Sequence, residues 1–349
     1  MSLLGSPGRR RRMALPVLGA VCSAICLQST AGAAPRPTID QVRKQVDQLH
    51  DQAEVATEKY NDTQGKVNGL KVQVSAAQQK VTQQQKALQE AQANLRQIAV
   101  DAYKAGDLAP LSLFFTDDPD RFLAADGLLQ SIGDRRADAV ESLARQRQLM
   151  VGGLTDQQEQ QQRLEQALKD LQANRAQVLG KLSDATNLLS QLTEEERNRL
   201  GLARSGQDRT SLSDLGVKVP ASGQLHCEDI PLSIPAGRAG KVVSYACAQV
   251  GKPYQWGADG PGVFDCSGLT MMAWKQAGVD LPHYAADQAT AGKKVSRGDL
   301  KPGDLVFFHS PISHVAIYIG NGLMLHAPQT GDVVKIVPLR SDLVTAATY

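Results

Sequence analysis

The sequence predicts a multidomain chain in which a long antiparallel α-helical coiled-coil hairpin precedes a compact α+β domain with an antiparallel sheet. Three observations support this fold class. Apolar residues recur every three or four positions over two long stretches, a segment rich in Gly, Ser, Asp and Pro follows them, and strand-like runs occupy the C-terminal part. The aromatic content of 4% is low and agrees with a chain that is partly extended.

Residues 1–33 have the three parts of an export signal. Four arginines at 9–12 precede an apolar stretch from Met13 to Leu27, and the small residues Ala31-Gly32-Ala33 follow. We expect cleavage after Ala33 and therefore a secreted protein, with an uncleaved anchor as the alternative. Loss of the four arginines changes the formal charge from +2 to −2, with 34 basic against 36 acidic residues, so the sequence does not indicate a nucleic-acid partner.

The first arm of the predicted hairpin begins at Ile39. Its apolar positions step by three and four as far as Ala102, and only Thr63 and Gln84 interrupt them. Polar and charged residues fill the remaining positions, which is typical of a coiled coil. At 1.5 Å per residue, this arm would be about 100 Å long.

A second apolar seam runs from Leu164 to Leu192 and is interpreted as the returning arm, which gives a hairpin over residues 38–204. Dimerisation of two chains is the competing way to cover both seams. Gly152-Gly153 predicts a bend in this arm. Thr193-Glu194-Glu195-Glu196 is interpreted as its end, with a linker at 205–236 before a compact domain at 237–349.

The tip between the arms, residues 106–127, differs from both of them because it is apolar. It contains three of the six phenylalanines of the chain, Phe114, Phe115 and Phe122. One interpretation is a docking patch for a membrane or a protein partner, and the other is a small local core that caps the coiled coil.

Three cysteines remain after removal of residues 1–33, which takes away Cys22 and Cys26. We expect Cys227 to pair with Cys247, closing a loop of roughly 20 residues, and Cys266 to remain a free thiol. Three unpaired cysteines are the alternative, since the sequence does not show whether the Cα atoms of two cysteines approach within bonding range.

Cys266 is the candidate nucleophile. It lies in Asp265-Cys266-Ser267-Gly268-Leu269, where a loop passes into a segment of helical character that Gly278 ends. The unpaired N–H groups at a helix start favour the thiolate and lower the thiol pKa. With the amide of Cys266 itself, they can also hold the oxyanion of an acyl-transfer reaction.

The candidate bases are four histidines: His283, His309, His314 and His326. His314 opens a strand-like run and His326 lies in the next one. A histidine oriented by a third polar residue can activate a thiol. We favour a solvated or structural role for His309.

The turn between the two strands decides whether His326 can orient His314. A two-residue turn, Asn321-Gly322, would place the two histidines on opposite faces. A three-residue loop, 320–322, would place Ala316 opposite His326 and both histidines on one face, at a diagonal spacing of about 7 to 8 Å. The chemistry therefore selects the second arrangement.

Metal binding is the alternative to nucleophilic catalysis for these side chains. Cys266, His309, His314 and His326 could supply four zinc ligands, but the sequence has no His-Glu-x-x-His or Cys-x-x-Cys spacing. We therefore expect neither a metal nor another cofactor.

On these motifs, residues from about Lys241 to Tyr349 resemble the NlpC/p60 family of cell-wall peptidases. The resemblance rests on Asp265 to Leu269 and on His314-Val315-Ala316-Ile317-Tyr318-Ile319-Gly320. It implies a papain-like α+β core with a central antiparallel sheet. It also implies that Cys266 is the nucleophile, His314 the base and His326 the orienting third residue.

The resemblance also implies the surroundings of the nucleophile. Tyr254 matches the tyrosine beside the nucleophile and would donate to the substrate carbonyl, whereas packing of its ring under Trp256 is the alternative. Asp265, Ser267 and Trp256 are expected at the oxyanion or the substrate. His283 departs from the family pattern, because small hydroxyl residues are common in this region of the relatives.

The implied substrate is the stem peptide of peptidoglycan, cut between D-glutamate and the diamino acid, at the cell wall. The hairpin is similar to that of mycobacterial Rip-type hydrolases and of division hydrolases that dock on the FtsE–FtsX membrane complex, and a short stretch, 192–197, shares in this likeness. A partner of the FtsE–FtsX type at the tip and regulation by the coiled coil follow as expectations. The alternatives are a non-catalytic wall-binding scaffold and an amidase or acyltransferase that uses the same thiol.

Overall fold

The computed structural model describes residues 38–104, 119–215, 217–220 and 224–349. The expected signal at 1–33 lies outside these residues. So does most of the expected apolar tip at 106–127, of which only the backbone from Pro119 onward is described. Within the described ranges, no helix combines the length and the apolar character that crossing a membrane requires.

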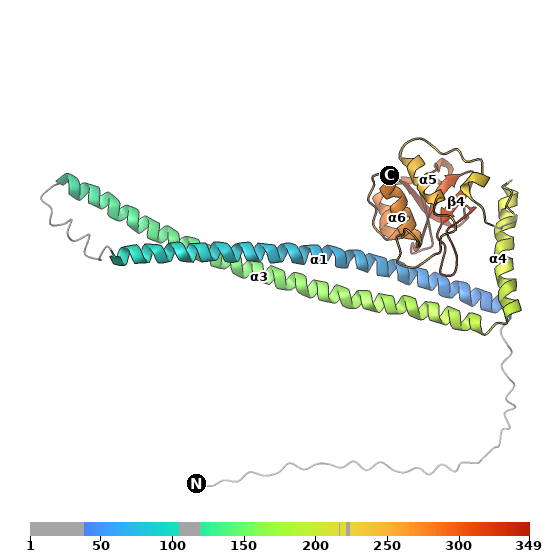
Figure 1. Cartoon of the computed structure of the whole chain (residues 1–349), viewed down its shortest axis with the longest axis horizontal. Helices are drawn as coiled ribbons and strands as arrows, with labels where there is room; N and C mark the ends of the chain where they lie inside the picture. The colour runs from blue at the N-terminus through green and yellow to red at the C-terminus, as the bar shows by residue number, and fades with distance from the viewer. Residues whose placement is uncertain (1–37, 105–118, 216, 221–223) are drawn as a thin grey trace, which may run out of the picture. The chain divides into compact units, whose positions relative to one another are not determined.

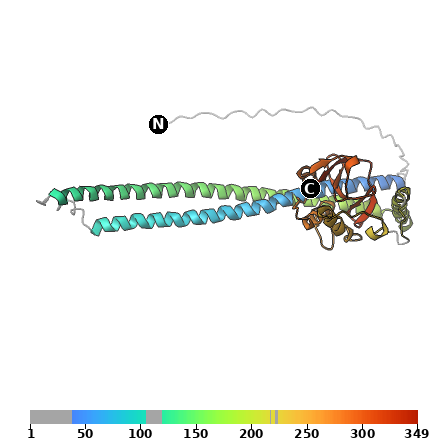
Figure 2. The same ribbon diagram turned by 90° about the horizontal axis from the view of Figure 1, so that it is seen from above.

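The two long helices are α1 (Ile39–Lys104) and α3 (Pro119–Ser190), which run alongside each other (Figures 1 and 2). Their contacts show that they are antiparallel. Nδ2 of Asn174 donates to Oγ1 of Thr63 over 2.9 Å, and Nζ of Lys80 lies 3.5 Å from Oδ2 of Asp156. The predicted hairpin is therefore formed within one chain.

The polar interruptions of the first seam are accommodated by α3. Thr63 is buried and accepts the hydrogen bond from Asn174. A Cβ atom on Gly153 would lie 2.0 Å from Oε1 of Gln84, so the glycine leaves room for that side chain. The chain does not leave the helix at Gly152-Gly153, because α3 is continuous through this region, and the bend expected there stays a prediction. Space for a side chain of the partner helix explains Gly153 better than a turn does.

The predicted end of the hairpin is also corrected. Thr193 begins a new helix, α4 (Glu194–Asp214), instead of ending the previous one. Its hydroxyl accepts from the amide of Glu196 over 3.2 Å, and the Glu196 carboxylate accepts from the amide of Thr193 over 2.8 Å. This reciprocal pair is a capping box, a signal for a helix start.

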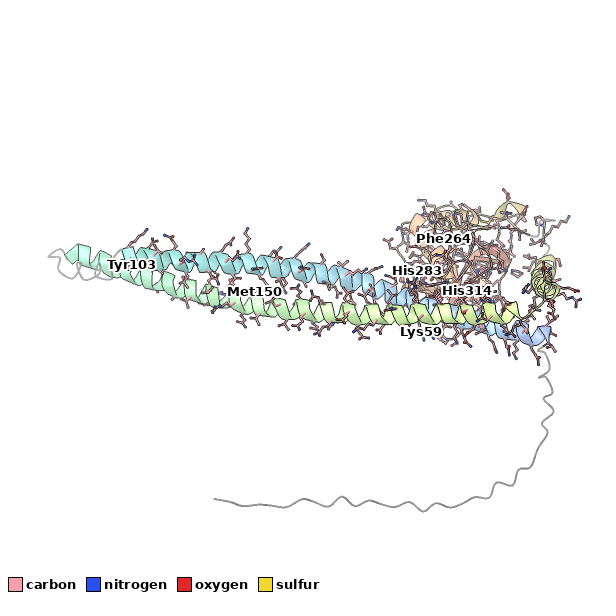
Figure 3. All side chains as sticks on the ribbon, turned by 60° about the horizontal axis from the view of Figure 1, so that its bottom comes forward. Lys59, Tyr103, Met150, Phe264, His283 and His314 are labelled. Carbon is pink, nitrogen blue, oxygen red and sulfur yellow. A yellow bond between two sulfur atoms is a disulfide. The ribbon has the colours of Figure 1, made fainter. Side chains whose placement is uncertain are left out.

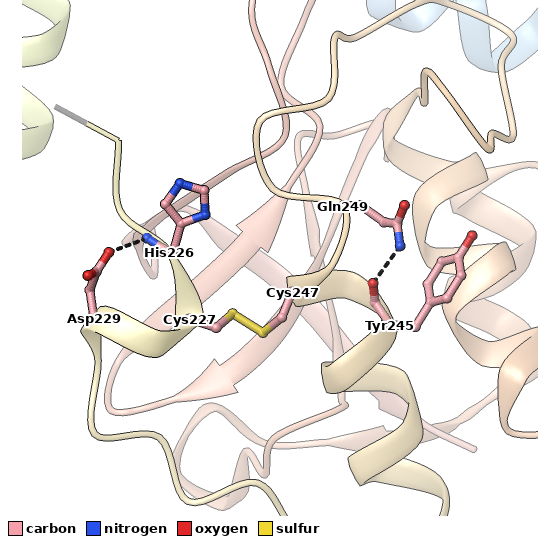
Figure 4. The surroundings of a disulfide bond; sticks show 6 residues. All are labelled: His226, Cys227, Asp229, Tyr245, Cys247 and Gln249. Atoms are coloured by element: carbon pink, nitrogen blue, oxygen red, sulfur yellow. Dashed lines mark hydrogen bonds between the residues drawn. A yellow bond between two sulfur atoms is a disulfide. The ribbon is translucent and has the colours of Figure 1, made fainter. Parts of the chain in front are cut away.

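The linker predicted at 205–236 is shorter than expected. Its first part is the end of α4. Leu225 and Ile230 are buried in the core of the C-terminal domain, so this domain takes in chain before residue 237. The disulfide between Cys227, in η1 (Cys227–Asp229), and Cys247, at the end of α5 (Arg238–Cys247), holds that segment to the domain (Figure 4). This is the pairing expected from the sequence.

The C-terminal domain is built on one antiparallel sheet of six strands, as predicted. Helices α6 (Cys266–Gln276) and α7 (Ala285–Ala291) precede the strands, and η2 (Arg297–Asp299) follows the first of them. The strand order is β1 (Lys293–Val295), β6 (Leu343–Thr348), β2 (Leu305–Phe308), β3 (His314–Gly320), β4 (Leu323–His326) and β5 (Lys335–Pro338).

The main core lies between the sheet and the helices. Leu269 of α6 and Val315 and Ile317 of β3 are all fully buried in it. Alternate residues of the same strands, such as Phe308 and Ala316, enter a smaller cluster on the other face. Because both faces of the central strands are covered, β3 is held rigidly against α6, and these two elements carry the candidate nucleophile and base.

The β3–β4 connection confirms the predicted register but not the predicted loop. Ile317 pairs with Leu325 and Tyr318 with Met324, which puts Ala316 opposite His326. Gly320 pairs with Leu323, so the turn itself has two residues, both with positive φ. The extra residue lies inside β3, as a bulge between Tyr318 and Gly320. A bulge shifts register by one residue, as the longer loop would have done.

Candidate active site

Cys266 is the first residue of α6, at the helix start that its sequence motif predicts. Asp265 is the N-cap. Its Oδ1 accepts from the amide of Gly268 over 2.7 Å, and its Oδ2 accepts from the amide of Gly257 over 2.9 Å. These bonds fix the loop in front of the helix and satisfy N–H groups that the helix leaves open.

The thiol of Cys266 is buried, with an exposed fraction of 1% for the residue. Sγ lies 3.7 Å from Oε1 of Glu58, a residue of α1. Burial raises the pKa of this thiol well above its ordinary value, and the carboxylates of Glu58, Glu54 and Asp265 raise it further. The lowered pKa expected from the helix start is therefore absent in this arrangement, because lost hydration and nearby negative charge outweigh the helix dipole.

His314 and His326 lie on one face of the sheet, as the predicted register requires. Nε2 of His314 and Nδ1 of His326 are 2.8 Å apart. Burial, His314 and the cations of Lys335 and Arg340 lower the pKa of His326 well below its ordinary value, so its ring is neutral. A neutral His326 can hold one nitrogen of His314 and leave the other, Nδ1, for a proton from a thiol.

That second nitrogen of His314 is occupied by α1. Oε1 of Glu54 lies 2.5 Å from Nδ1 of His314, and both residues are buried. Glu54, Cys266 and His314 bring one polar atom each to within 4.8 Å of one another. The carboxylate therefore stands where the base would otherwise meet the thiol.

Glu58, one turn further along α1, fills the space beside the nucleophile. Its Oε1 accepts from the Ser267 hydroxyl over 2.7 Å, and its Oε2 accepts from the amide of Ala285. Burial and the neighbouring Asp265 raise the pKa of Glu58 to about 8. This carboxyl group is held in its neutral form over part of the neutral pH range.

Two further residues of α1 contact the expected substrate residues. Nδ2 of Asn61 donates to Oδ2 of Asp265 over 2.9 Å and lies 3.3 Å from the Ser267 hydroxyl. The ring of Tyr60 packs edge-on against Trp256, with centroids 5.2 Å apart. Residues 54–61 of α1 thus reach most of the side chains that the sequence assigns to catalysis or substrate binding.

Tyr254 lies in the same buried site. Burial raises the pKa of its phenol well above the ordinary value, and the next cause is Cys266. A neutral hydroxyl beside the nucleophile can donate a hydrogen bond, as a substrate carbonyl requires. Trp256 takes Tyr60 as its aromatic neighbour.

Two other histidines, His283 and His309, lie near the site. Figure 3 labels His283 together with His314. Nε2 of His283 lies 2.8 Å from Oδ1 of Asp265. The histidine that departs from the family pattern therefore contacts the N-cap residue of α6. His309 contacts the Ser313 hydroxyl through Nδ1 at 3.0 Å, with Glu54 at 3.7 Å. Neither ring contacts the thiol, and the structural role favoured for His309 remains a prediction.

Glu54, Glu58, Tyr60 and Asn61 are site residues that were not predicted from the sequence. They lie on α1, about 200 residues before the nucleophile in the chain. A signal was available, because Glu54, Glu58 and Asn61 step by four and three and so share one helix face. Such a polar stripe on a coiled coil is normally solvated, and only the fold shows that this one is buried.

A cavity of about 640 Å³ adjoins the far side of His326. Its lining includes Asp47 of α1 together with Lys335 and Arg340 of the C-terminal domain. Nε2 of His326 is buried and has no hydrogen-bond partner among the described residues. Among the described residues, His314 is therefore the hydrogen-bond partner of the His326 ring, through Nδ1 alone.

Known proteins resemble the region that contains Cys266, His314 and His326. Residues 251–349 match the NlpC/P60 family. A probable endopeptidase of Mycobacterium tuberculosis (strain ATCC 25618 / H37Rv) is 46% identical over 129 residues, which are 36% of this chain and 33% of the relative.

Two further relatives carry names that describe an activity. The gamma-D-glutamyl-L-lysine dipeptidyl-peptidase of Bacillus subtilis is 40% identical over 115 residues, 32% of this chain and 39% of its own. The peptidoglycan endopeptidase RipA of Mycolicibacterium smegmatis is 40% identical over 118 residues, 30% of this chain and 24% of its own. This chain therefore spans well under half the length of these relatives.

Proposed function

We propose that this chain, whose C-terminal region is an NlpC/P60 domain, is a secreted cysteine peptidase that cuts peptidoglycan stem peptides and is held inactive by α1. The family assignment of residues 251–349 supports the chemistry, since its members are cysteine peptidases. One observation carries the regulatory part. Glu54 and Glu58 of α1 occupy the base and the space beside the nucleophile.

In the proposed reaction, α1 first leaves the site. Nδ1 of His314 then takes the thiol proton of Cys266, and the thiolate attacks the peptide carbonyl carbon. The amide of Cys266 and the Tyr254 hydroxyl would stabilise the oxyanion. His314 returns the proton to the leaving amine, and water hydrolyses the thioester with His314 again as base.

The proposed bond lies between D-glutamate and the diamino acid of the stem peptide. The Bacillus relative is named for a gamma-D-glutamyl-L-lysine link, and RipA is named for peptidoglycan. These names belong to the relatives. They make the same class of link the first substrate to test here.

The proposed inhibition follows from chemistry and packing together. While Nδ1 of His314 is engaged by Glu54, it cannot take the proton of Cys266. The Glu58 carboxyl group lies beside Sγ, where a scissile carbonyl would have to approach. A substrate must therefore displace α1, and activation requires a partner or condition that moves this helix.

The test compares full-length protein with the double variant Glu54→Ala/Glu58→Ala on purified stem peptides, with mass spectrometry of the products. We expect the variant to be at least ten times faster and to release fragments cut after D-glutamate, and Cys266→Ala to be inactive. Equal rates in the two proteins would contradict the proposed inhibition by α1. Products cut at another amide or transferred to an amine would indicate amidase or acyltransferase chemistry, and no products would favour a wall-binding scaffold.

The place of action and the partner are part of the proposal. Residues 1–33 have the pattern of an export signal, which would bring the protein to the cell wall. An apolar hairpin tip at 106–127 would suit a membrane complex of the FtsE–FtsX type, which links such hydrolases to cell division. Deletion of residues 106–127 should abolish activation in cells and leave the activity of the double variant intact.

A further inference from the structure

The contact between α1 and the catalytic domain brings together three side chains with metal-ligand atoms, and a fourth, Glu58, lies beside one of them. Glu54, Cys266 and His314 place one such atom each within 4.8 Å of the other two. Oε1 of Glu58 lies 3.7 Å from Sγ of Cys266. We propose that this closed arrangement binds one Zn²⁺ ion, which joins α1 to the catalytic pair.

The separations suit a tetrahedral ion. Zinc binds sulfur at about 2.3 Å and nitrogen or oxygen at about 2.0 to 2.2 Å, so neighbouring ligand atoms lie about 3.3 to 3.8 Å apart. The 3.7 Å between Glu58 and Cys266 already falls in this range. The distance of 2.5 Å between Oε1 of Glu54 and Nδ1 of His314 is that of a hydrogen bond. This distance would increase when the ion replaces the shared proton. Glu58 lies outside the three-residue cluster, so its carboxylate must move towards Glu54 and His314 to become the fourth ligand.

Charge and burial favour a cation at this position. Glu58, Cys266 and His314 have exposed fractions of 1%, 1% and 2%, so water does little to compensate their charges. Asp265, in contact with Asn61 of α1, adds another carboxylate. A divalent ion offsets this negative charge and converts the thiol to the thiolate, with release of its proton.

The ligands are oriented in advance by their neighbours. Nε2 of His314 is held at 2.8 Å by His326, which leaves Nδ1 for the metal. The second oxygen of Glu58 is held by the amide of Ala285. Hydrogen bonds of this kind orient the side chains that bind the metal directly and raise the metal affinity.

This ligand set differs from the one that the sequence suggested, Cys266 with three histidines. Two of the proposed ligands come from α1, and no zinc spacing motif connects residues so far apart. A neighbouring cluster of Asp51, Glu54 and His309 shares Glu54, but Asp51 is exposed and the cluster has no sulfur. Zinc prefers the site with the thiolate.

The consequence is a metal-dependent closed state. Because the ion needs ligands from both α1 and the domain, it binds the closed form and stabilises it by mass action. At free zinc about 100 times the dissociation constant, the open fraction falls about 100-fold. The inference uses the inhibitory contact of the proposed function and no property of the substrate.

The test uses full-length protein stripped of metal by a chelator and titrated with Zn²⁺ and, separately, with Co²⁺ as a spectroscopic probe. We expect one equivalent of zinc and, with cobalt, the sulfur-to-metal charge-transfer band and the intense visible bands of a tetrahedral site. The double variant Glu54→Gln/Glu58→Gln should bind zinc at least ten times more weakly. Cys266→Ser should lose the charge-transfer band, and the exposed α1 variant Glu90→Gln should match the wild type.

Each outcome bears on the inference separately from peptidase activity, because no substrate is present. Binding without a sulfur band would place the metal on Asp51, Glu54 and His309 and overturn the proposal. An unchanged affinity in the double Gln variant would overturn it as well, since the ion would then not depend on α1. Absence of zinc binding to the wild type would have the same result.

Discussion

Oε1 of Glu54 lies 2.5 Å from Nδ1 of His314, the nitrogen that the candidate thiol needs as its base. The two residues are separated by 260 positions in the sequence. A side chain of the coiled coil thus contacts the candidate base of another domain. We expect this contact to be a closed state that can open.

Replacement of Glu54 by Ala should expose the nucleophile. It removes a charge-assisted hydrogen bond, worth about 1.5 to 3 kcal/mol, and leaves the buried His314 without that partner. We expect the alkylation rate of Cys266 in the full-length protein to rise by about 10- to 100-fold. Mass spectrometry of iodoacetamide-treated protein measures the rate at Cys266.

The matched control for this measurement is Glu90→Ala, an exposed position on the same helix. It should react at the wild-type rate. If Glu54→Ala also reacts at that rate, the carboxylate does not restrain the site and the closed state must depend on other contacts.

Opening should depend on pH through Glu58. Burial, and then Asp265, raise the pKa of Glu58 from 4.5 to about 8 in the closed state. The closed form therefore holds a proton that the open form has lost between these two pH values. The closed contact is fully favourable below about pH 4.5 and weakens as the pH rises towards 8, by up to about tenfold in the opening equilibrium per pH unit.

The fluorescence of Trp256, which packs against Tyr60 of α1, can report this opening, with a chelator present throughout. The groups that face Glu58 are Asp265, Cys266, Ser267 and His283, and the profile will include the titration of His283, whose pKa is raised by Asp265. Glu58→Gln cannot titrate at this position and should flatten the profile between pH 5 and about 8. An identical profile in Glu58→Gln would assign the pH dependence to another group.

Much of the C-terminal domain could be predicted from local signals. The motif around Cys266 indicated a helix start, and Asp265 caps that helix through Gly268. The register that brings His326 to His314 was predicted from chemistry. The device that produces it was not, because a bulge in β3 and a three-residue loop shift the register equally.

The contacts of α1 with the candidate site could not be predicted from the sequence. Glu58 and Asn61 read as the solvated face of a coiled coil, since local periodicity does not show which faces a distant domain will cover. Thr193 was misassigned for a related reason. Its capping box marks a helix start, but the charged run that follows it resembles a frayed helix end when the next segment is polar.

His326 should act as a positioning residue for His314. Replacement by Ala removes the 2.8 Å contact that fixes the tautomer and orientation of the base. In the Glu54→Ala/Glu58→Ala background, we expect kcat to fall by about 100-fold or more, with a smaller change in KM. The pH profile of kcat should also shift, because His314 loses its neighbour.

His326→Asn offers a polar side chain at the same place and should recover part of the lost kcat. A merely structural role predicts a different pattern. In that case both variants would lose stability together and show the wild-type pH profile in the fraction that remains folded.

The disulfide between Cys227 and Cys247 should stabilise the C-terminal domain without taking part in catalysis. It closes a loop with a sequence separation of 20 and holds η1 against the end of α5. On the chain-entropy estimate, a loop of this size contributes about 3 kcal/mol. We therefore expect Cys227→Ser/Cys247→Ser to lower the free energy of unfolding by about that amount, measured by denaturant titration with tryptophan fluorescence.

Changing both cysteines avoids a new unpaired thiol, so Cys266 remains the reactive cysteine of the domain. Its alkylation rate in the Glu54→Ala background should be unchanged by the double Ser substitution, because neither sulfur of the disulfide lies in the contacts of the site. Reduction of the wild-type disulfide should reproduce the loss of stability. If the double Ser variant is fully folded but its Cys266 is alkylated much more slowly, the N-terminal segment of the domain affects the geometry of the active site.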